Sequence, residues 1–93
     1  MSDSGYEVVV TRPAARALSG ELPPAVAAAV VELIIGPLAD RPHAVGSPLR
    51  RELDGLWAAR RGSYRVIYRI VEERREVVII RIDHRRDAYR RLD

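Results

Sequence analysis

Two strand-like segments separated by a short charged turn constrain the fold of this chain more than any other feature of its sequence. Residues 64–70 (YRVIYRI) are rich in aromatic and β-branched side chains, and residues 77–82 (VVIIRI) are apolar except for Arg81. The aromatic and β-branched side chains of residues 64–70 are typical of a strand. The nearly continuous apolar run of residues 77–82 is typical of a strand in the middle of a sheet. The segment VEERRE between them predicts a turn. The sequence therefore predicts a hairpin whose second strand is central.

The first half of the chain predicts one strand and two helices. Residues 6–11 are rich in β-branched side chains and predict an opening strand. Thr11 can cap a short helix that reaches Gly20, and a second helix begins at Pro23-Pro24 and continues through AVAAAVVELIIGPLAD. Gly36-Pro37 is expected to bend or end this second helix. Its apolar stripe, which predicts packing against a sheet, consists of Val26, Val30, Leu33 and Ile34.

The order of these elements predicts an α+β fold. Residues 42–48 (PHAVGSP) read as a loop, another strand is expected to start near Leu56, and Gly62-Ser63 predicts the turn into the next strand. The resulting order, β-α-α-β-β-β, predicts a helical hairpin packed on one face of a twisted, mostly antiparallel sheet. The other face of the sheet is left uncovered. A chain of 93 residues has little room for a second core, so residues 1–93 are expected to form a single domain.

Two missing residue types limit the available chemistry. Without cysteine, the chain has no disulfide, no thiolate nucleophile and no cysteine metal site. Lysine is absent too, so every basic side chain apart from the two histidines is an arginine, which binds phosphate but does not act as a general base. No residues stand at metal-ligand spacing, and we expect neither a metal nor a cofactor. The first ten residues do not show the basic start and long apolar run that are typical of a signal peptide, and the apolar run of the second helix is too short to span a membrane. We therefore expect a cytoplasmic protein.

Positive charge is concentrated in the last third of the chain. Residues 60–91 contain eleven of the sixteen arginines and five acidic residues, whereas residues 1–59 contain five arginines and seven acidic residues. A guanidinium presents a planar fork that matches two phosphate oxygens. RNA or DNA is therefore the leading class of partner.

The strand over residues 64–70 predicts how these arginines are arranged. Side chains alternate along a strand, so Arg65, Ile67 and Arg69 share one face, and residues 64, 66, 68 and 70 share the other. On the next strand, Val77, Ile79 and Arg81 are expected to share a face. If the register brings the strands together suitably, Arg65, Arg69 and Arg81 line one cationic trough. The alternative is a solvated face of weak salt bridges, for which the available acids are Glu52, Asp54, Asp83 and Asp87.

The C-terminal segment HRRDAYRR contains groups that can transfer protons. His84 has an imidazole that can accept or donate a proton, and positive neighbours favour the ionised phenol of Tyr89. RNA is cleaved without a metal when its own 2′-hydroxyl attacks the adjacent phosphate, which requires a base, cations and a proton donor. His84 or Tyr89 can supply the proton-transfer groups, although a lone histidine in a basic tail is more often a plain surface residue.

The other aromatic and histidine side chains are assigned no catalytic part. Trp57 and Tyr64 flank the basic turn and can stack on unpaired bases. For Trp57, packing under the hairpin as the largest core residue is the favoured interpretation. His43 lies in a predicted loop without a carboxylate at metal-ligand spacing.

Two long stretches of the sequence resemble RelE-type toxins of the RelE/ParE superfamily. LDGLWAARRGSYRVIYRI followed by IIRIDHRRDAYRR is similar to the C-terminal half of these proteins, and YEVVVTRPAARAL, PLAD and PLRREL are similar to the first half. The resemblance implies a RelE-like microbial RNase toxin fold and a toxin of a type II toxin–antitoxin system. Such toxins cleave mRNA in the ribosomal decoding site without a metal, by 2′-hydroxyl attack, and a cognate antitoxin silences them in a hetero-oligomeric complex.

The resemblance also implies roles for individual residues. Arg65 corresponds to the family's strand arginine and Tyr89 to its terminal tyrosine, while Arg85, or failing that Arg86, corresponds to its tail arginine. The expected catalytic residues are Arg65, Arg85, Tyr89 and His84. The residues expected to bind RNA are Arg60, Arg61, Arg69, Arg81 and Arg86.

The chain departs from the family pattern at two places. Where some relatives carry paired lysines, this sequence has Leu56 and Ala58, so a general base must be Tyr89 or His84, or catalysis depends more on positioning by the ribosome. Asp83 stands where many relatives have glycine, and its carboxylate can hold His84 or an arginine or weaken phosphate binding. Two alternatives to the nuclease are a ParE-like inhibitor of DNA gyrase and a weakened toxin that only binds its antitoxin or RNA.

Overall fold

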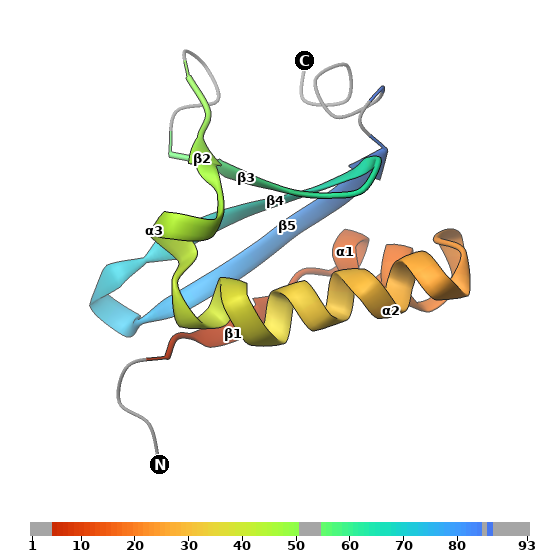
Figure 1. The fold of residues 1–93 in the computed structure, drawn as a ribbon. Helices are drawn as coiled ribbons and strands as arrows, with labels where there is room; N and C mark the ends of the chain where they lie inside the picture. The colour runs from red at the N-terminus through yellow and green to blue at the C-terminus, as the bar shows by residue number, and fades with distance from the viewer. Residues whose placement is uncertain (1–4, 51–54, 85, 87–93) are drawn as a thin grey trace.

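The structure, a computed structural model, describes residues 5–50, 55–84 and 86. Helices lie under one face of a five-stranded sheet, which confirms the predicted α+β class (Figure 1). The elements follow one another as β1 (Glu7–Val10), α1 (Arg12–Arg16), η1 (Ala17–Glu21), α2 (Pro24–Leu33), η2 (Ile34–Leu38), α3 (Pro42–Val45), β2 (Ser47–Pro48), β3 (Trp57–Arg61), β4 (Tyr64–Val71), η4 (Glu72–Arg74) and β5 (Glu76–His84).

The strand order is β1-β5-β4-β3-β2, with β1 parallel to β5 and the other neighbours antiparallel. Strand β5 therefore has a partner on each side, which confirms that the apolar run near residue 80 is a central strand. The prediction of a loop over residues 42–48 is wrong in part. Pro42 begins one turn of helix α3, and Ser47–Pro48 pairs with β3 as a short edge strand.

Helices α1 and α2 each continue as a π-helical segment. Helix α1 passes into the wider π-helical segment η1, and α2 passes into η2, which contains Pro37. Because proline has no N–H to donate, the α-helical hydrogen-bond pattern is interrupted there and the chain widens. The expected bend or end at Gly36-Pro37 is thus a π-helical continuation to Leu38.

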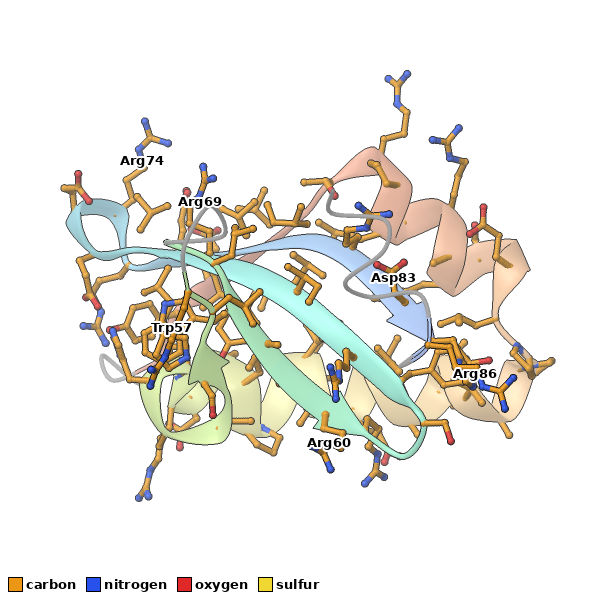
Figure 2. The ribbon with its side chains drawn as sticks, turned by 90° about the horizontal axis from the view of Figure 1, so that it is seen from above. Trp57, Arg60, Arg69, Arg74, Asp83 and Arg86 are labelled. Carbon is orange, nitrogen blue, oxygen red and sulfur yellow. The ribbon has the colours of Figure 1, made fainter. Side chains whose placement is uncertain are left out.

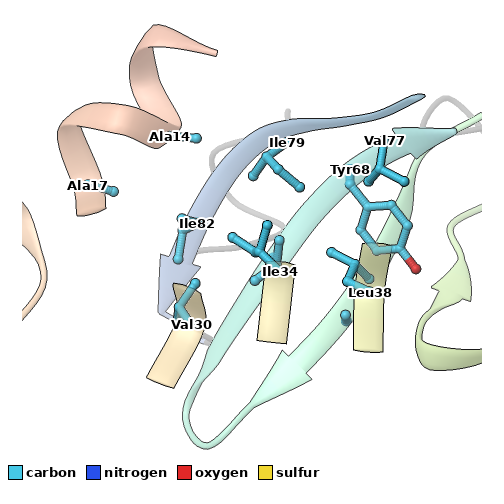
Figure 3. Close-up of a cluster of buried hydrophobic side chains, with 11 residues drawn as sticks. Ala14, Ala17, Val30, Ile34, Leu38, Tyr68, Val77, Ile79 and Ile82 are labelled. Atoms are coloured by element: carbon cyan, nitrogen blue, oxygen red, sulfur yellow. The ribbon is translucent and has the colours of Figure 1, made fainter. Parts of the chain in front are cut away.

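Helix α2 and its continuation form the core with the strands above them. Val30, Ile34 and Leu38 are buried against side chains of β4 and β5, so the predicted apolar stripe is confirmed (Figure 3). The strand residues in this cluster are Ala59, Val66, Tyr68, Val77, Ile79 and Ile82, and α1 and η1 add Ala14 and Ala17. This cluster therefore lies on one face of the sheet, and Ile67 is a buried hydrophobic residue on the opposite face.

A β-bulge in β5 corrects the predicted alternation of that strand. Ile67 pairs with Arg81 and Tyr68 pairs with Ile79, so Ile80 is an extra residue without a partner on β4. Val77 and Ile79 belong to the core, but the extra residue moves Arg81 to the opposite face. The prediction that Arg81 shares a face with Val77 and Ile79 is therefore wrong.

Thr11 has a different role from the predicted one. It occupies the N-cap position of α1, but its side chain makes no capping hydrogen bond. Its hydroxyl lies 2.7 Å from the carbonyl oxygen of Ile79 and 2.8 Å from that of Ile80. The side chain thus binds backbone carbonyls at the bulge, where the regular hydrogen-bond ladder of the sheet is interrupted. Within the described residues, no helix is long and apolar enough to cross a membrane.

Candidate nucleic-acid interface

The face of the sheet turned away from α2 carries four arginines. We call it the open face, and its side chains include those of Ala58, Arg60, Arg65, Ile67, Arg69, Val78, Arg81 and Asp83. One row across the strands pairs Arg60 with Arg65 and Arg65 with Asp83, and the next pairs Ala58 with Ile67 and Ile67 with Arg81. Arg69 lies four residues, or about 13 Å, along β4 from Arg65.

This arrangement brings together three arginines that the sequence placed in one trough. Arg65, Arg69 and Arg81 share the open face because the bulge places Arg81 on the side of the sheet opposite to Val77 and Ile79. Arg60, expected at the basic turn, joins them from β3. Arg60 and Arg69 are exposed, whereas Arg65 and Arg81 are half-buried. A row of guanidinium groups of this kind provides several phosphate contacts along a single strand.

Asp83 is the buried acid within this group of arginines. Its side chain is only 9% exposed, and Arg81 Nε lies 2.9 Å from its Oδ2. By strand pairing it is also directly opposite Arg65. Of the roles considered for this carboxylate, the structure shows that it holds an arginine. An ion pair at this distance restricts the direction of the Arg81 side chain and reduces repulsion among its cationic neighbours.

His84 and Arg61 lie on the other face. They flank Tyr64 in one row across β3, β4 and β5, and the rings of Tyr64 and His84 meet edge to face with centroids 5.3 Å apart. Neighbouring residues of a strand point to opposite faces, so His84 is separated from Arg65 by the thickness of the sheet. The predicted site is therefore divided between two faces at the same end of the hairpin.

The segment after β5 is described only at Arg86. This residue is exposed, and its backbone N–H donates a hydrogen bond to His84 Nδ1 over 3.2 Å. The acceptor nitrogen carries no proton in this arrangement. Figure 2 shows Arg86 and Asp83 at one end of the sheet and Trp57 at the other. Arg85 and Tyr89 lie outside the described residues, and so do Glu52, Asp54 and Asp87.

The aromatic residues gather at the end of the sheet away from Asp83. Trp57 stacks on Tyr68 at 6.3 Å and meets His43 at 5.4 Å, so it packs against the core, as favoured from the sequence. His43 Nε2 contacts the Glu72 carboxylate over 2.6 Å. This pair links α3 to the turn after β4. Among the described residues, no group of histidines and acids is arranged to hold a metal ion.

A hollow of about 320 Å³ adjoins Arg60 and Arg65, and sequence reasoning missed it. Its opposite wall is formed by residues 45–49, of which 45–48 were predicted to be loop. Gly46 is the one available signal, because a glycine before a strand often marks close approach of two backbones. The sequence alone did not indicate which strand Gly46 approaches.

Comparisons with known proteins add a family to this geometry. A family model described as "ParE toxin of type II toxin-antitoxin system, parDE" matches residues 11–89. Toxin RelG of Mycobacterium tuberculosis is 55% identical over 86 residues, which cover 92% of this chain and 98% of that protein. Toxin RelE of the same organism is 49% identical over 88 residues, covering 95% of this chain and 90% of that protein.

Two solved structures share the fold. The toxin–antitoxin complex RelBE2 of Mycobacterium tuberculosis contains a chain that is 51% identical, with a TM-score of 0.83, covering 89% of this chain and 94% of that one. The archaeal RelE–RelB complex of Pyrococcus horikoshii gives 27% identity and a TM-score of 0.61, covering 87% and 96%. Both structures are complexes of a toxin with its antitoxin.

Proposed function

This chain belongs to the RelE-type toxins of type II toxin–antitoxin systems, and from that premise we propose that it is an endoribonuclease that cleaves mRNA on the ribosome. The observation that carries the proposal is the open face, where Arg60, Arg65, Arg69 and Arg81 are collected on one side of the sheet. In the proposed reaction a 2′-hydroxyl loses its proton to a base and attacks the adjacent phosphorus, which forms a 2′,3′-cyclic phosphate. The bond to the 5′-oxygen of the next nucleotide breaks, and that oxygen leaves as a hydroxyl after it is protonated. The proposed site of action is the cytoplasm, where the ribosomes are.

Arg65 is the proposed centre of charge stabilisation. Attack on a phosphate gathers negative charge on its non-bridging oxygens, and fixed cations at that position lower the barrier. Arg65 is half-buried between its neighbours Arg60 and Asp83, so its side chain is held more firmly than an exposed arginine. Arg81, bound to Asp83, and the exposed Arg69 are proposed to hold phosphates further along the strand.

Proton transfer is the proposed role of Tyr89, with Arg85 as the second arginine at the phosphate. Ala58 lies on the open face beside Ile67, at a position where some relatives have a lysine, and its methyl group cannot move a proton. His84 faces away from Arg65, which favours Tyr89 over His84 as the base. Arg61 and Arg86, both exposed near the hairpin end, are proposed to contact RNA outside the reacting centre.

Expression of the chain and its variants in a bacterial host tests the proposal. The wild type should arrest growth and generate cut mRNA, whereas Arg65→Ala and Tyr89→Phe should allow growth. Arg12→Ala, an exposed arginine on α1, serves as the control and should remain toxic. Equal arrest by wild type and Arg65→Ala, or arrest with intact mRNA, would show that the proposal is wrong.

The partner that silences the toxin is proposed to be the product of an adjacent small gene. This proposal is supported by the solved relatives, which are complexes with antitoxins. An antitoxin is expected to cover arginines with acidic side chains and to form a hetero-oligomer with the toxin. Co-expression should give one co-purifying complex and restore growth, and a toxin that purifies alone contradicts this expectation.

Inhibition of DNA gyrase is the second candidate, because the matching family model is described by the ParE toxin. Such an inhibitor acts through protein contacts and needs no arranged phosphate site. It predicts induction of the DNA-damage response with mRNA left whole, and toxicity that survives Arg65→Ala. The clustering of arginines on the open face favours the nuclease.

A further inference from the structure

The hollow beside Arg60 and Arg65 has one preformed wall. Ser47 pairs with Ala58 and Pro48 pairs with Trp57, which joins β2 to the edge of the sheet. After β2, the backbone N–H of Leu49 donates to the carbonyl of Leu56 over 2.8 Å. These contacts hold residues 47–49 against β3, so the shape of the wall does not depend on a ligand.

Gly46 brings this wall into close contact with the core. A Cβ atom at this position would lie 2.7 Å from the carbonyl oxygen of Ala58 and would also collide with the Tyr68 hydroxyl. Tyr68 is fully buried, and its hydroxyl donates to the carbonyl of Pro42 over 2.6 Å. Because neither neighbour can move away easily, only glycine fits, and both ends of the wall are fixed.

The lining of the hollow combines cationic, polar and apolar groups. Arg60 and Arg65 supply cations on one side, while Val45, Pro48, Leu49 and Ala58 supply small apolar surfaces. Ser47 adds a hydroxyl that both donates and accepts. A nucleotide is complementary to this lining. Its phosphate is anionic and matches the arginines, the two faces of its base are apolar, and the edges of the base are polar.

Two of the other hollows fit a nucleotide less well. A space of about 340 Å³ between α1 and β5 is lined by two arginines and two acids, Arg16, Arg81, Glu21 and Asp83, so its charges balance. A space of about 380 Å³ between α2 and the β3–β4 turn has Arg61 as its only charged lining residue. Among the residues that the structure describes, the hollow at Arg60 and Arg65 is lined by two cations and no acid.

We propose that this hollow binds one base of single-stranded RNA, with the phosphate of the same nucleotide held by Arg60 and Arg65. A volume of about 320 Å³ lies at the lower end of the roughly 300–1,000 Å³ range of small-molecule sites, which suits one nucleotide and not several. The inference rests on the proposed function and deepens it, since a base held beside Arg65 selects the position of the cut.

Binding of nucleoside 3′-monophosphates to the purified chain tests this inference without requiring cleavage. Backbone amide shifts measured by NMR should move at Gly46, Ser47 and Ala58 as well as at the arginines. Ribose 5-phosphate, which has a phosphate but no base, should bind on the order of tenfold more weakly, because no base is buried. Equal affinity for both ligands, or shifts confined to Arg60 and Arg65, overturns the proposal.

Ser47→Phe fills the hollow and should remove the preference for the base. Ser47 is exposed on a short edge strand, so the larger side chain does not enter the core. Ser19→Phe, at an exposed serine of η1, is the matched control and should retain the preference. Thermal midpoints of both variants within a few degrees of the wild type show that each is folded. A preference that persists in Ser47→Phe contradicts the inference.

The outcomes separate this inference from the proposed function. Nucleotides that bind in the hollow while ribosome-bound mRNA stays intact support the base site and reject the nuclease. Cut mRNA with unchanged cleavage positions in Ser47→Phe supports the nuclease and rejects the base site. Amide shifts in the hollow produced by an antitoxin-derived peptide, with none from the nucleotides, reject the base site in favour of a protein contact.

Discussion

At the scale of single residues, Asp83 shows how an acid can be accommodated within a face of arginines. Its carboxylate is buried, holds Arg81 over 2.9 Å and stands opposite Arg65 in the sheet. The sequence left several roles open for this residue because the face on which Arg81 lies depends on one extra residue in β5. The positions of Arg65 and Arg69, by contrast, follow from plain alternation along β4 and were predicted correctly.

Replacing Asp83 with asparagine should lower stability and strengthen binding to RNA. The change leaves Arg81 without its charged partner and should lower the free energy of unfolding by about 1–3 kcal/mol. It also removes one negative charge from the open face, so the affinity for single-stranded RNA should rise. Urea unfolding and RNA titration measure the two effects. Asp40→Asn, at an exposed pair with Arg41, should change neither, and RNA binding weakened by Asp83→Asn would contradict this role.

Tyr68 provides a prediction about alkaline pH. Burial raises the pKa of this phenol from 10 to about 12. The unfolded chain then loses the proton before the folded one does, so the free energy of unfolding should fall as pH rises from about 10 to 12. Tyr68→Phe should lower stability at neutral pH by about 1 kcal/mol, because the bond to the Pro42 carbonyl is lost. In urea unfolding it should also show a smaller alkaline decrease than the wild type. An identical alkaline decrease in both proteins would contradict this assignment.

At the scale of elements, the bulge in β5 connects the fold to the site. Local spacing was enough to predict strands β4 and β5, the turn between them and the apolar stripe on α2. The bulge was not predictable in this way, because its partner, the Thr11 hydroxyl, is 68 residues distant from Ile79. The short strand β2 was also missed, since two residues carry no periodicity.

Deleting one residue from β5 distinguishes the bulge from the regular ladder. Loss of Ile80 leaves Val77, Ile79 and Ile82 on the core face and Arg81 on the open face, so the protein should still fold with a moderate loss of stability. Loss of Ile82 instead places a charged side chain on the core face, Asp83 if the bulge is kept and Arg81 if it is lost, so this variant should be much less stable. Circular dichroism and thermal unfolding of both variants measure the difference. An Ile82 deletion as stable as the Ile80 deletion would contradict the assigned register.

At the scale of the whole molecule, the charge polarity of the sequence becomes a division between the faces of a sheet. The basic last third predicted a polyanion partner, and its hairpin carries the arginines of the open face. The sequence did not indicate that His84 and Arg65 lie on opposite faces, because the face of each residue on β5 depends on the strand register and the bulge. The roles of Arg85 and Tyr89 remain predictions, since both lie outside the described residues.

Salt dependence measures how many phosphates the open face holds. For a single strand, the logarithm of the binding constant falls with the logarithm of salt concentration by roughly 0.7 per phosphate contact. Arg60→Ala combined with Arg65→Ala should therefore make the slope shallower by about 1.4. Arg12→Ala, on α1, should leave it unchanged. A slope that is flat in the wild type would mean that these arginines do not contact phosphate.

The central claim is most directly tested by primer extension on an mRNA incubated with ribosomes and the purified chain, together with the same mRNA carrying one 2′-deoxy nucleotide at the mapped cut. We predict cleavage that leaves a 2′,3′-cyclic phosphate, disappears at the 2′-deoxy position and falls roughly 10²–10³-fold in Arg65→Ala. Cleavage that persists at the 2′-deoxy position, or that is equally fast without Arg65, would contradict the claim.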